Sequence, residues 1–245
     1  MKFTEVDELS QRLAACLQEF DPKQAFNLVH PLLETRTPFR TLDRLGTKIG
    51  TPSLKTLNPF LDLLAQSHTE GGWVLIGSTL ASQIQTDLRS AMHRCRSFII
   101  MADVWYATGI LGERVPGAAL VARFDETLER LRPWREDSNR WVRRALGHAT
   151  HVWAKRSKGQ ITTYQNAEAL LVFLEPLFEE HDTDALKGIG WGLKTMGKYY
   201  PDKVAVWLQK MLVQEKRTPR NLMLKKACAH LPEQVRLRLD EKRLT

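Results

Sequence analysis

The fold is best read from the stretch SNRWVRRALGHATHVWAK, residues 138–155. Basic and imidazole side chains recur in it at spacings of four, four, three and four residues, at Arg140, Arg144, His148, His151 and Lys155. This spacing predicts one continuous stripe on an α-helix. The opposite side is apolar from Val142 to Trp153, as in a helix packed on a core. A helix with one buried face and one positive face is suited to a negatively charged partner.

The same helical period recurs along the whole chain, and strand-like alternation between hairpin turns is missing. Proline and glycine are expected to break the helices at Pro38, Pro52, Gly71–Gly72, Pro116–Gly117, Pro133, Gly159, Pro201, Pro219 and Pro232. We predict about ten to twelve helices joined by short turns. The fold class is therefore all-α, an α-solenoid of stacked antiparallel helix pairs (HEAT-like repeats) with a concave basic face. Poor similarity between successive pairs leaves a plain helical bundle as the alternative.

The composition describes a basic globular protein. The 245 residues are 43% hydrophobic, enough for a substantial core, and carry a net charge of +8 with a pI of about 9.5. No linker or low-complexity segment divides them, so we predict a single domain spanning residues 1–245. A positive balance favours nucleic acid or another anionic surface as partner, although it does so only modestly when taken alone.

Several classes of protein are disfavoured. Three scattered cysteines, Cys16, Cys95 and Cys228, argue against a disulfide scaffold or zinc site and fit a reducing compartment. His148 and His151 lack a third ligand, so no metal is expected, and no motif calls for a cofactor. The N-terminus does not resemble a signal peptide, and no stretch approaches about 18 consecutive apolar residues. We expect a cytoplasmic monomer that makes no contact with membranes.

A second basic stripe is predicted at Lys187, Trp191, Lys194 and Lys198. An indole among ammonium groups suits an aromatic platform beside bound phosphates. The alternative is a tryptophan packed on the neighbouring repeat, with lysines extending around it. Glycines at 188, 190, 192 and 197 would admit another backbone closely, either of a helix or of a nucleic-acid strand.

A third basic cluster comprises Lys216, Arg217, Arg220, Lys225 and Lys226. Taken alone, a solvated surface is the better interpretation of it. Three basic segments in the C-terminal half nevertheless favour a common surface.

Three of these segments together resemble the AlkD-like DNA alkylation repair family: SNRWVRRA, then DALKGIGWGLKTMGKYYPD, then TPRNLMLKKACAHLPE. The resemblance covers roughly residues 73–232. It implies a HEAT-like fold and double-stranded DNA as partner. Members of this family that act as enzymes are DNA glycosylases that remove cationic alkylated purines, such as 3-methyladenine and 7-methylguanine.

The resemblance places the family's functional residues at Trp105, Arg144 and Trp191, but Gly109 stands where its enzymes carry the catalytic carboxylate. Glu113, one turn beyond Gly109, is a substitute acid or else an exposed residue paired with Arg114. The catalytic residue therefore stays unassigned. We predict DNA contacts at nine positions: Trp105, Arg140, Arg144, His148, Lys155, Lys187, Trp191, Lys194 and Lys198.

Three functions stay open at this point. The chain is a glycosylase with an altered acid, a non-catalytic relative that grips damaged or distorted duplex DNA, or a HEAT-like scaffold for other proteins. We favour DNA binding over catalysis, which would place the protein with the nucleoid when bound.

Overall fold

The computed structural model describes residues 3–243, which form fifteen α-helices and contain no strand. The predicted all-α class is confirmed. The helices are more numerous than predicted because residues 105–131 break into short pieces around a π-helical turn at Glu113–Gly117. They fall into two compact units, which divide between Val115 and Pro116 and are described separately. The single domain stays a prediction.

The N-terminal unit is built from seven helices: α1 (Phe3–Gln18), α2 (Pro22–Glu34), α3 (Phe39–Ile49), α4 (Leu54–Gln66), α5 (Glu70–Ser82), α6 (Leu88–Ala102) and α7 (Trp105–Gly112). Within it, α1, α3, α5 and α7 contact one another in sequence as one row, and α2, α4 and α6 form a second row. The rows bury the apolar side of each helix between them, including Phe60, Trp73 and Phe98.

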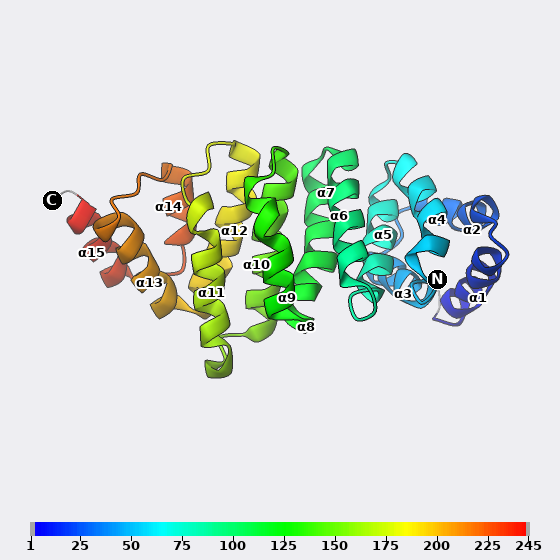
Figure 1. Cartoon of the computed structure of the whole chain (residues 1–245), viewed down its shortest axis with the longest axis horizontal. Coiled ribbons are helices and arrows are strands. Elements are labelled where there is room, and N and C mark those ends of the chain that lie inside the picture. Colours follow the sequence, from blue (N-terminus) through cyan, green and yellow to red (C-terminus); the bar gives the residue numbers. More distant parts are fainter. Residues whose placement is uncertain (1–2, 244–245) are drawn as a thin grey trace. The chain divides into compact units, whose positions relative to one another are not determined.

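The C-terminal unit holds the remaining helices: α8 (Ala118–Ala122), α9 (Phe124–Leu131), α10 (Arg140–Ser157), α11 (Tyr164–Leu174), α12 (Thr183–Tyr199), α13 (Pro201–Gln209), α14 (Asn221–Ala227) and α15 (Glu233–Arg243). Short turns η2 (Arg132–Glu136), η3 (Ile161–Thr163), η4 (Glu175–Leu177) and η5 (Lys210–Gln214) connect them. Helices α8, α10, α12 and α14 contact in sequence, as do α9, α11, α13 and α15. In Figure 1, α11 and α13 lie in front of α12 and α14.

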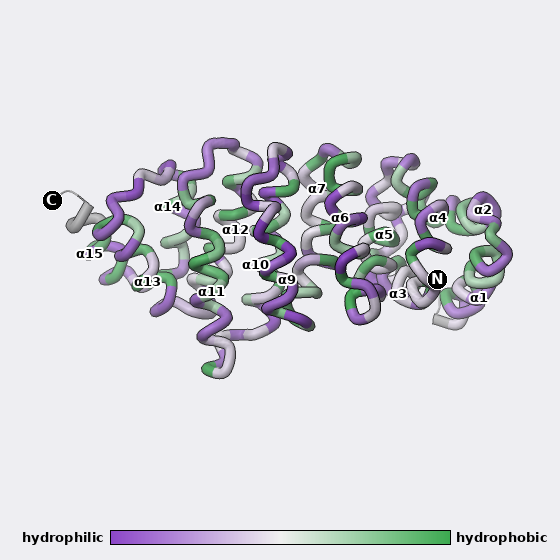
Figure 2. The backbone as a smooth tube through the Cα atoms, viewed as in Figure 1, coloured by the Kyte–Doolittle hydropathy of each residue, from purple (hydrophilic) through white to green (hydrophobic). Residues whose placement is uncertain are grey.

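Two rows of helices in each unit are consistent with an α-solenoid, whereas the concave basic face stays a prediction. Hydrophobic and hydrophilic stretches alternate along most helices in Figure 2, as expected of helices with one side on a core. None of the described helices is long and apolar enough to cross a membrane.

Most of the predicted breaks lie at helix ends. Pro38 precedes α3, Pro201 is the first residue of α13, and Gly159 takes a positive φ of 72° after α10. The break expected at Gly71–Gly72 lies slightly earlier, at residues 67–69, because α4 ends at Gln66 and both glycines fall in the first turn of α5. A Cβ on Gly71 would lie 3.2 Å from side-chain atoms of Leu33 and Leu42, so glycine allows close packing here.

Candidate nucleic-acid interface

Helices α10 and α12 pack unusually closely, backbone against backbone. A methyl group on Gly147 of α10 would overlap the carbonyl group of Gly188, and one on Gly192 would lie 2.7 Å from the Gly147 oxygen. On the other side of α12, a Cβ on Gly190 would meet the side chain of Lys226, and one on Gly197 would lie 3.3 Å from the carbonyl oxygen of Ala227 in α14. The α12 glycines therefore allow neighbouring helices to pack closely. Of the two backbones that the sequence left open, a helix and a nucleic-acid strand, it is the helix that they admit.

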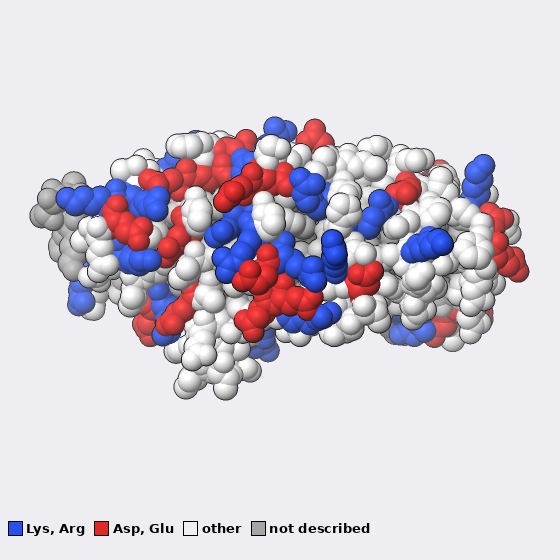
Figure 3. All heavy atoms as spheres, viewed as in Figure 1, with Lys and Arg blue, Asp and Glu red and all other residues white. Residues whose placement is uncertain are grey.

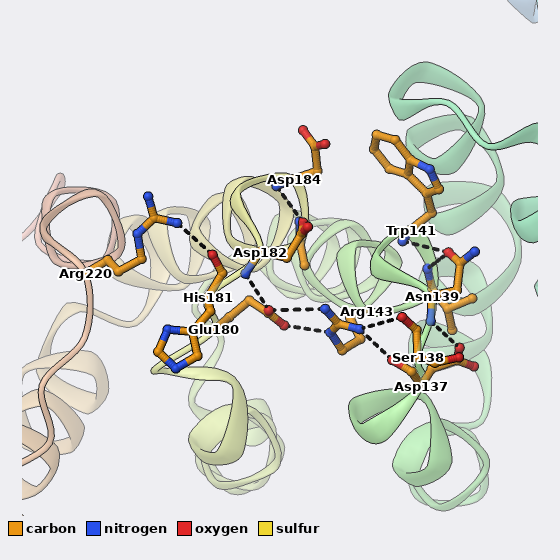
Figure 4. A network of polar contacts seen from close by, with 12 residues as sticks. Asp137, Ser138, Asn139, Trp141, Arg143, Glu180, His181, Asp182, Asp184 and Arg220 are labelled. Atoms are coloured by element: carbon orange, nitrogen blue, oxygen red, sulfur yellow. Dashed lines mark hydrogen bonds and ion pairs between the residues drawn. The ribbon is translucent and has the colours of Figure 1, made fainter.

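A polar network joins the N-terminal ends of the two helices (Figure 4). Asn139 caps α10 and Asp182 caps α12. Between them, Arg143 Nε donates to Glu180 Oε2 at 2.7 Å and Nη1 donates to the Asp137 carbonyl at 2.6 Å. Glu180 raises the pKa of Arg143. Arg143 therefore holds α10 against the loop that precedes α12.

The basic stripe of α10 is only partly exposed. Arg140 and Lys155 are exposed and His151 is half-buried, whereas Arg144 and His148 are buried. The sequence pattern implied an exposed stripe, and this is wrong at its centre because glycines bring α12 over the middle of α10. Arg144 and His148, two of the predicted DNA contacts, therefore have side chains that lie between helices and not on the exposed surface.

Arg144 is 8% exposed. Its Nη1 donates to the Asp184 carbonyl oxygen at 2.8 Å, while within the described part of the chain its buried Nε has no hydrogen-bond partner. Burial lowers the pKa of Arg144, and Asp184 partly opposes this. A buried guanidinium with an unused donor is under-satisfied, which an anion could relieve.

The second predicted stripe is exposed throughout, at Lys187, Trp191, Lys194 and Lys198. Trp191 is 46% exposed, so it is not a core tryptophan. Its indole lies against α10, edge-on to His151 with ring centroids 5.3 Å apart and tilted toward His148 at 6.0 Å. Trp191 Nε1 donates a hydrogen bond of 2.6 Å to His151 Nδ1. The N–H edge of the indole is thereby fixed to a histidine.

Lys226 of α14, a member of the third basic cluster that was not among the nine predicted DNA contacts, joins this region. Burial lowers its pKa, and Lys194, Arg144 and Lys187 lower it further. Its aliphatic stem lies over Gly190. Four cations from three helices are therefore held close together. No spacing along the chain could have revealed this, because Lys226 and Arg144 lie on different helices.

The rest of the third basic cluster behaves otherwise. Arg217 Nη1 donates to Glu179 Oε2 at 2.9 Å, and Arg220 Nη1 donates to the His181 carbonyl at 2.8 Å. These arginines join neighbouring loops. Basic and acidic side chains are likewise intermixed on the side displayed in Figure 3. In the outer row, defined as α9, α11, α13 and α15 with the turns between them, Lys210 Nζ donates to Glu175 Oε1 at 2.7 Å.

Acids are scarce around the four cations. Helices α10 and α14 contain none, and α12 contains only Asp184. Its carboxylate lies 3.7 Å from Arg140 Nε and 3.8 Å from Lys187 Nζ. The cation cluster, defined as Arg144, Lys187, Lys194 and Lys226, thus keeps a local excess of positive charge. Among the residues whose side chains the structure describes, 4–239, no group of three or more His, Cys, Asp or Glu is arranged to hold a metal ion.

The sequence profile of the DNA alkylation repair enzyme family matches residues 47–231. The chain belongs to this family. Comparisons with curated proteins and with solved structures gave no match. Membership in the DNA alkylation repair family supports a role in the repair of alkylated DNA and indicates DNA as a partner.

In this alkylation repair family member, Gly109, where the resemblance predicts a carboxylate, lies with its neighbours in the N-terminal unit. Trp105 begins α7 and is 61% exposed. Gly109 lies in the middle of α7, and Glu113 follows the helix, half-buried at the start of the π-helical turn. Arg114, the partner expected for Glu113, instead makes a two-pronged ion pair with Asp43, with Nε 2.7 Å from Oδ1. That Trp105 faces one groove with Arg144 and Trp191 stays a prediction.

Proposed function

We propose that this protein binds the backbone of damaged or distorted duplex DNA through the α10–α12–α14 face, and that it does so without cleaving the glycosidic bond. The observation that carries the proposal is the position of Lys226, whose side chain packs on Gly190 of α12, where burial and then Lys194, Arg144 and Lys187 lower its pKa. Like charges held together in the free protein repel one another, and phosphates inserted among them remove that repulsion.

Trp191 adds a surface for a base or sugar beside this charge. Stacking of a nucleobase on an aromatic side chain contributes about 1–3 kcal/mol. Because Lys187 and Lys194 flank the indole on the same helix stripe, a strand whose phosphates reach the lysines would bring its bases close to the ring. Distortion or damage that unstacks a base would make this contact easier.

The absence of catalysis is inferred from Gly109. Glycosidic cleavage develops positive charge on the sugar, which a carboxylate stabilises while it orients water. The position at which the resemblance predicts that group is Gly109, which has no side chain. A glycosylase that uses Glu113 is the second candidate, since this acid lies one turn beyond Gly109.

The binding proposal is tested by the affinity for duplex DNA at several salt concentrations. Replacing Lys226 or Lys194 with Met should weaken binding and reduce the slope of log affinity against log salt by about 0.9 for each lost phosphate contact. Lys210→Met is the matched control, because Lys210 is paired with Glu175 in the outer row. Equal effects at Lys210 and Lys226, or wild-type binding that ignores salt, would contradict the proposal.

Release of free base from duplex DNA carrying 3-methyladenine or 7-methylguanine tests catalysis. We expect none from the wild type. Release that is lost in Glu113→Gln would establish the second candidate instead. Release only by Gly109→Asp would mark an active site that has lost its acid.

A further inference from the structure

The Trp191 platform is fixed by one hydrogen bond whose donor cannot change. An indole N–H only donates, so His151 Nδ1, 2.6 Å from Trp191 Nε1, must accept. This requires the neutral imidazole with its proton on Nε2. The structure therefore contains a histidine whose protonation state decides whether the tryptophan is held.

Thr195 supplies a second partner for the same nitrogen. Its Oγ1 lies 2.7 Å from His151 Nδ1 and 3.1 Å from the Trp191 carbonyl oxygen. If Nδ1 gains a proton, it can donate to Thr195 Oγ1, which in turn donates to the Trp191 carbonyl. In the neutral form the single Nδ1 lone pair accepts from the indole N–H while Thr195 donates to the Trp191 carbonyl oxygen, and only this form holds the indole N–H.

We propose that His151 is the positioning residue of Trp191, and that protonation of His151 transfers its Nδ1 hydrogen bond to Thr195 and releases the indole. The inference deepens the proposed function, and it rests on that function only for its DNA-binding readout. Histidine is the side chain whose charge ordinarily changes between about pH 5 and pH 8.

The other ionisable groups of this face are mostly cations. Helix α10 carries His148 and Lys155 one turn to either side of His151, with Arg144 beyond, and α12 carries Lys187, Lys194 and Lys198. Helix α14 contributes Lys226, and Asp184 lies at the first turn of α12. Of these, His148 is the other histidine, and its ring also lies against Trp191. It must therefore be tested separately.

The test records the indole N–H resonances of the seven tryptophans in free protein labelled with nitrogen-15, between about pH 8 and pH 5. Loss of one signal in Trp191→Phe assigns Trp191. Its signal should move with pH in the wild type and in His148→Asn. It should stay fixed in His151→Asn, whose amide oxygen can accept at the same place without titrating. In His151→Leu it should lie near the acidic wild-type position at every pH.

A Trp191 signal that is constant in the wild type, or that titrates equally in His151→Asn, overturns the proposal. So does a titration that disappears in His148→Asn. Because no DNA is present, this result is independent of the proposed function. As a second readout at pH 8, His151→Leu should bind duplex DNA about five-fold more weakly and His151→Asn should not, as expected for one lost hydrogen bond. Equal affinities of the two variants at pH 8 would show that the hydrogen bond does not position Trp191 for DNA.

Discussion

Gly147→Ala is the substitution that most directly tests the close packing of α10 on α12. The added methyl group would overlap the carbonyl carbon and oxygen of Gly188 and crowd the amide nitrogen of Ile189. These are backbone atoms inside a helix, so they cannot rotate away as the end of a side chain could. The two helices must move apart.

The expected cost follows from two opposing effects. Overpacking a core typically costs about 1–3 kcal/mol, and a backbone obstacle places this site at about 3 kcal/mol. Alanine in place of glycine inside a helix stabilises the helix by about 1 kcal/mol through its higher helix propensity. The net destabilisation is about 2 kcal/mol, or roughly 4–8 °C in melting temperature for a chain of this length.

Urea unfolding followed by circular dichroism measures this difference, with Gly197→Ala as the control. Gly197 lies in α12, and its Cβ would meet the Ala227 oxygen at 3.3 Å, a contact that a small shift can relieve. Its free energy of unfolding should stay within about 1 kcal/mol of the wild type, because the gain in helix propensity offsets the crowding. Equal stability of the two variants would refute the backbone contact between α10 and α12.

Three further variants test individual charges. Arg143→Met should cost about 3 kcal/mol in urea unfolding, since it leaves the buried carboxylate of Glu180 without its cation; a cost under about 1 kcal/mol would contradict the network. Glu179→Gln should lower stability at pH 7 but not near pH 3: the Thr218 N–H chiefly lowers the pKa of Glu179 below 4.5, so its stabilisation is present above the unfolded value and is lost as pH falls through the folded one. A gap between the variant and the wild type that persists in acid would exclude that origin. Lys226→Met should leave stability unchanged or higher, because it removes repulsion and a partly buried charge, while DNA binding weakens; a clear loss of stability would show that Lys226 is structural.

Much of the fold follows from the sequence, because helical period and proline positions are local signals. Pro201 begins a helix and the apolar face of α10 is buried, as the pattern predicts. The break expected at Gly71–Gly72 lies instead at residues 67–69, because Thr69 caps α5 by accepting from the Gly72 N–H and thereby includes both glycines in the first turn.

The site was less predictable, because a stripe drawn on one helix assumes that only the opposite face is covered. Helix α10 packs along α12 as well as on the core, so Arg144 and His148 are buried despite lying on the polar stripe. Lys226 approaches Lys194 from another helix, and Trp191 meets His151 across a helix pair. Such contacts depend on which helices become neighbours, which periodicity does not specify.

The glycines and the cations of the α10–α12–α14 face both support the proposal that an anion binds there. Gly188 and Gly192 admit α10, and Gly190 admits the stem of Lys226, although each glycine costs about 1 kcal/mol of helix propensity relative to alanine. What this packing brings together is a set of positive charges that repel one another. Helix propensity alone would favour alanine at these positions, and electrostatics alone would favour a carboxylate among the lysines. The lost helix propensity and the repulsion among the cations occur on one face, beside an exposed tryptophan. Binding of an anion there would explain both.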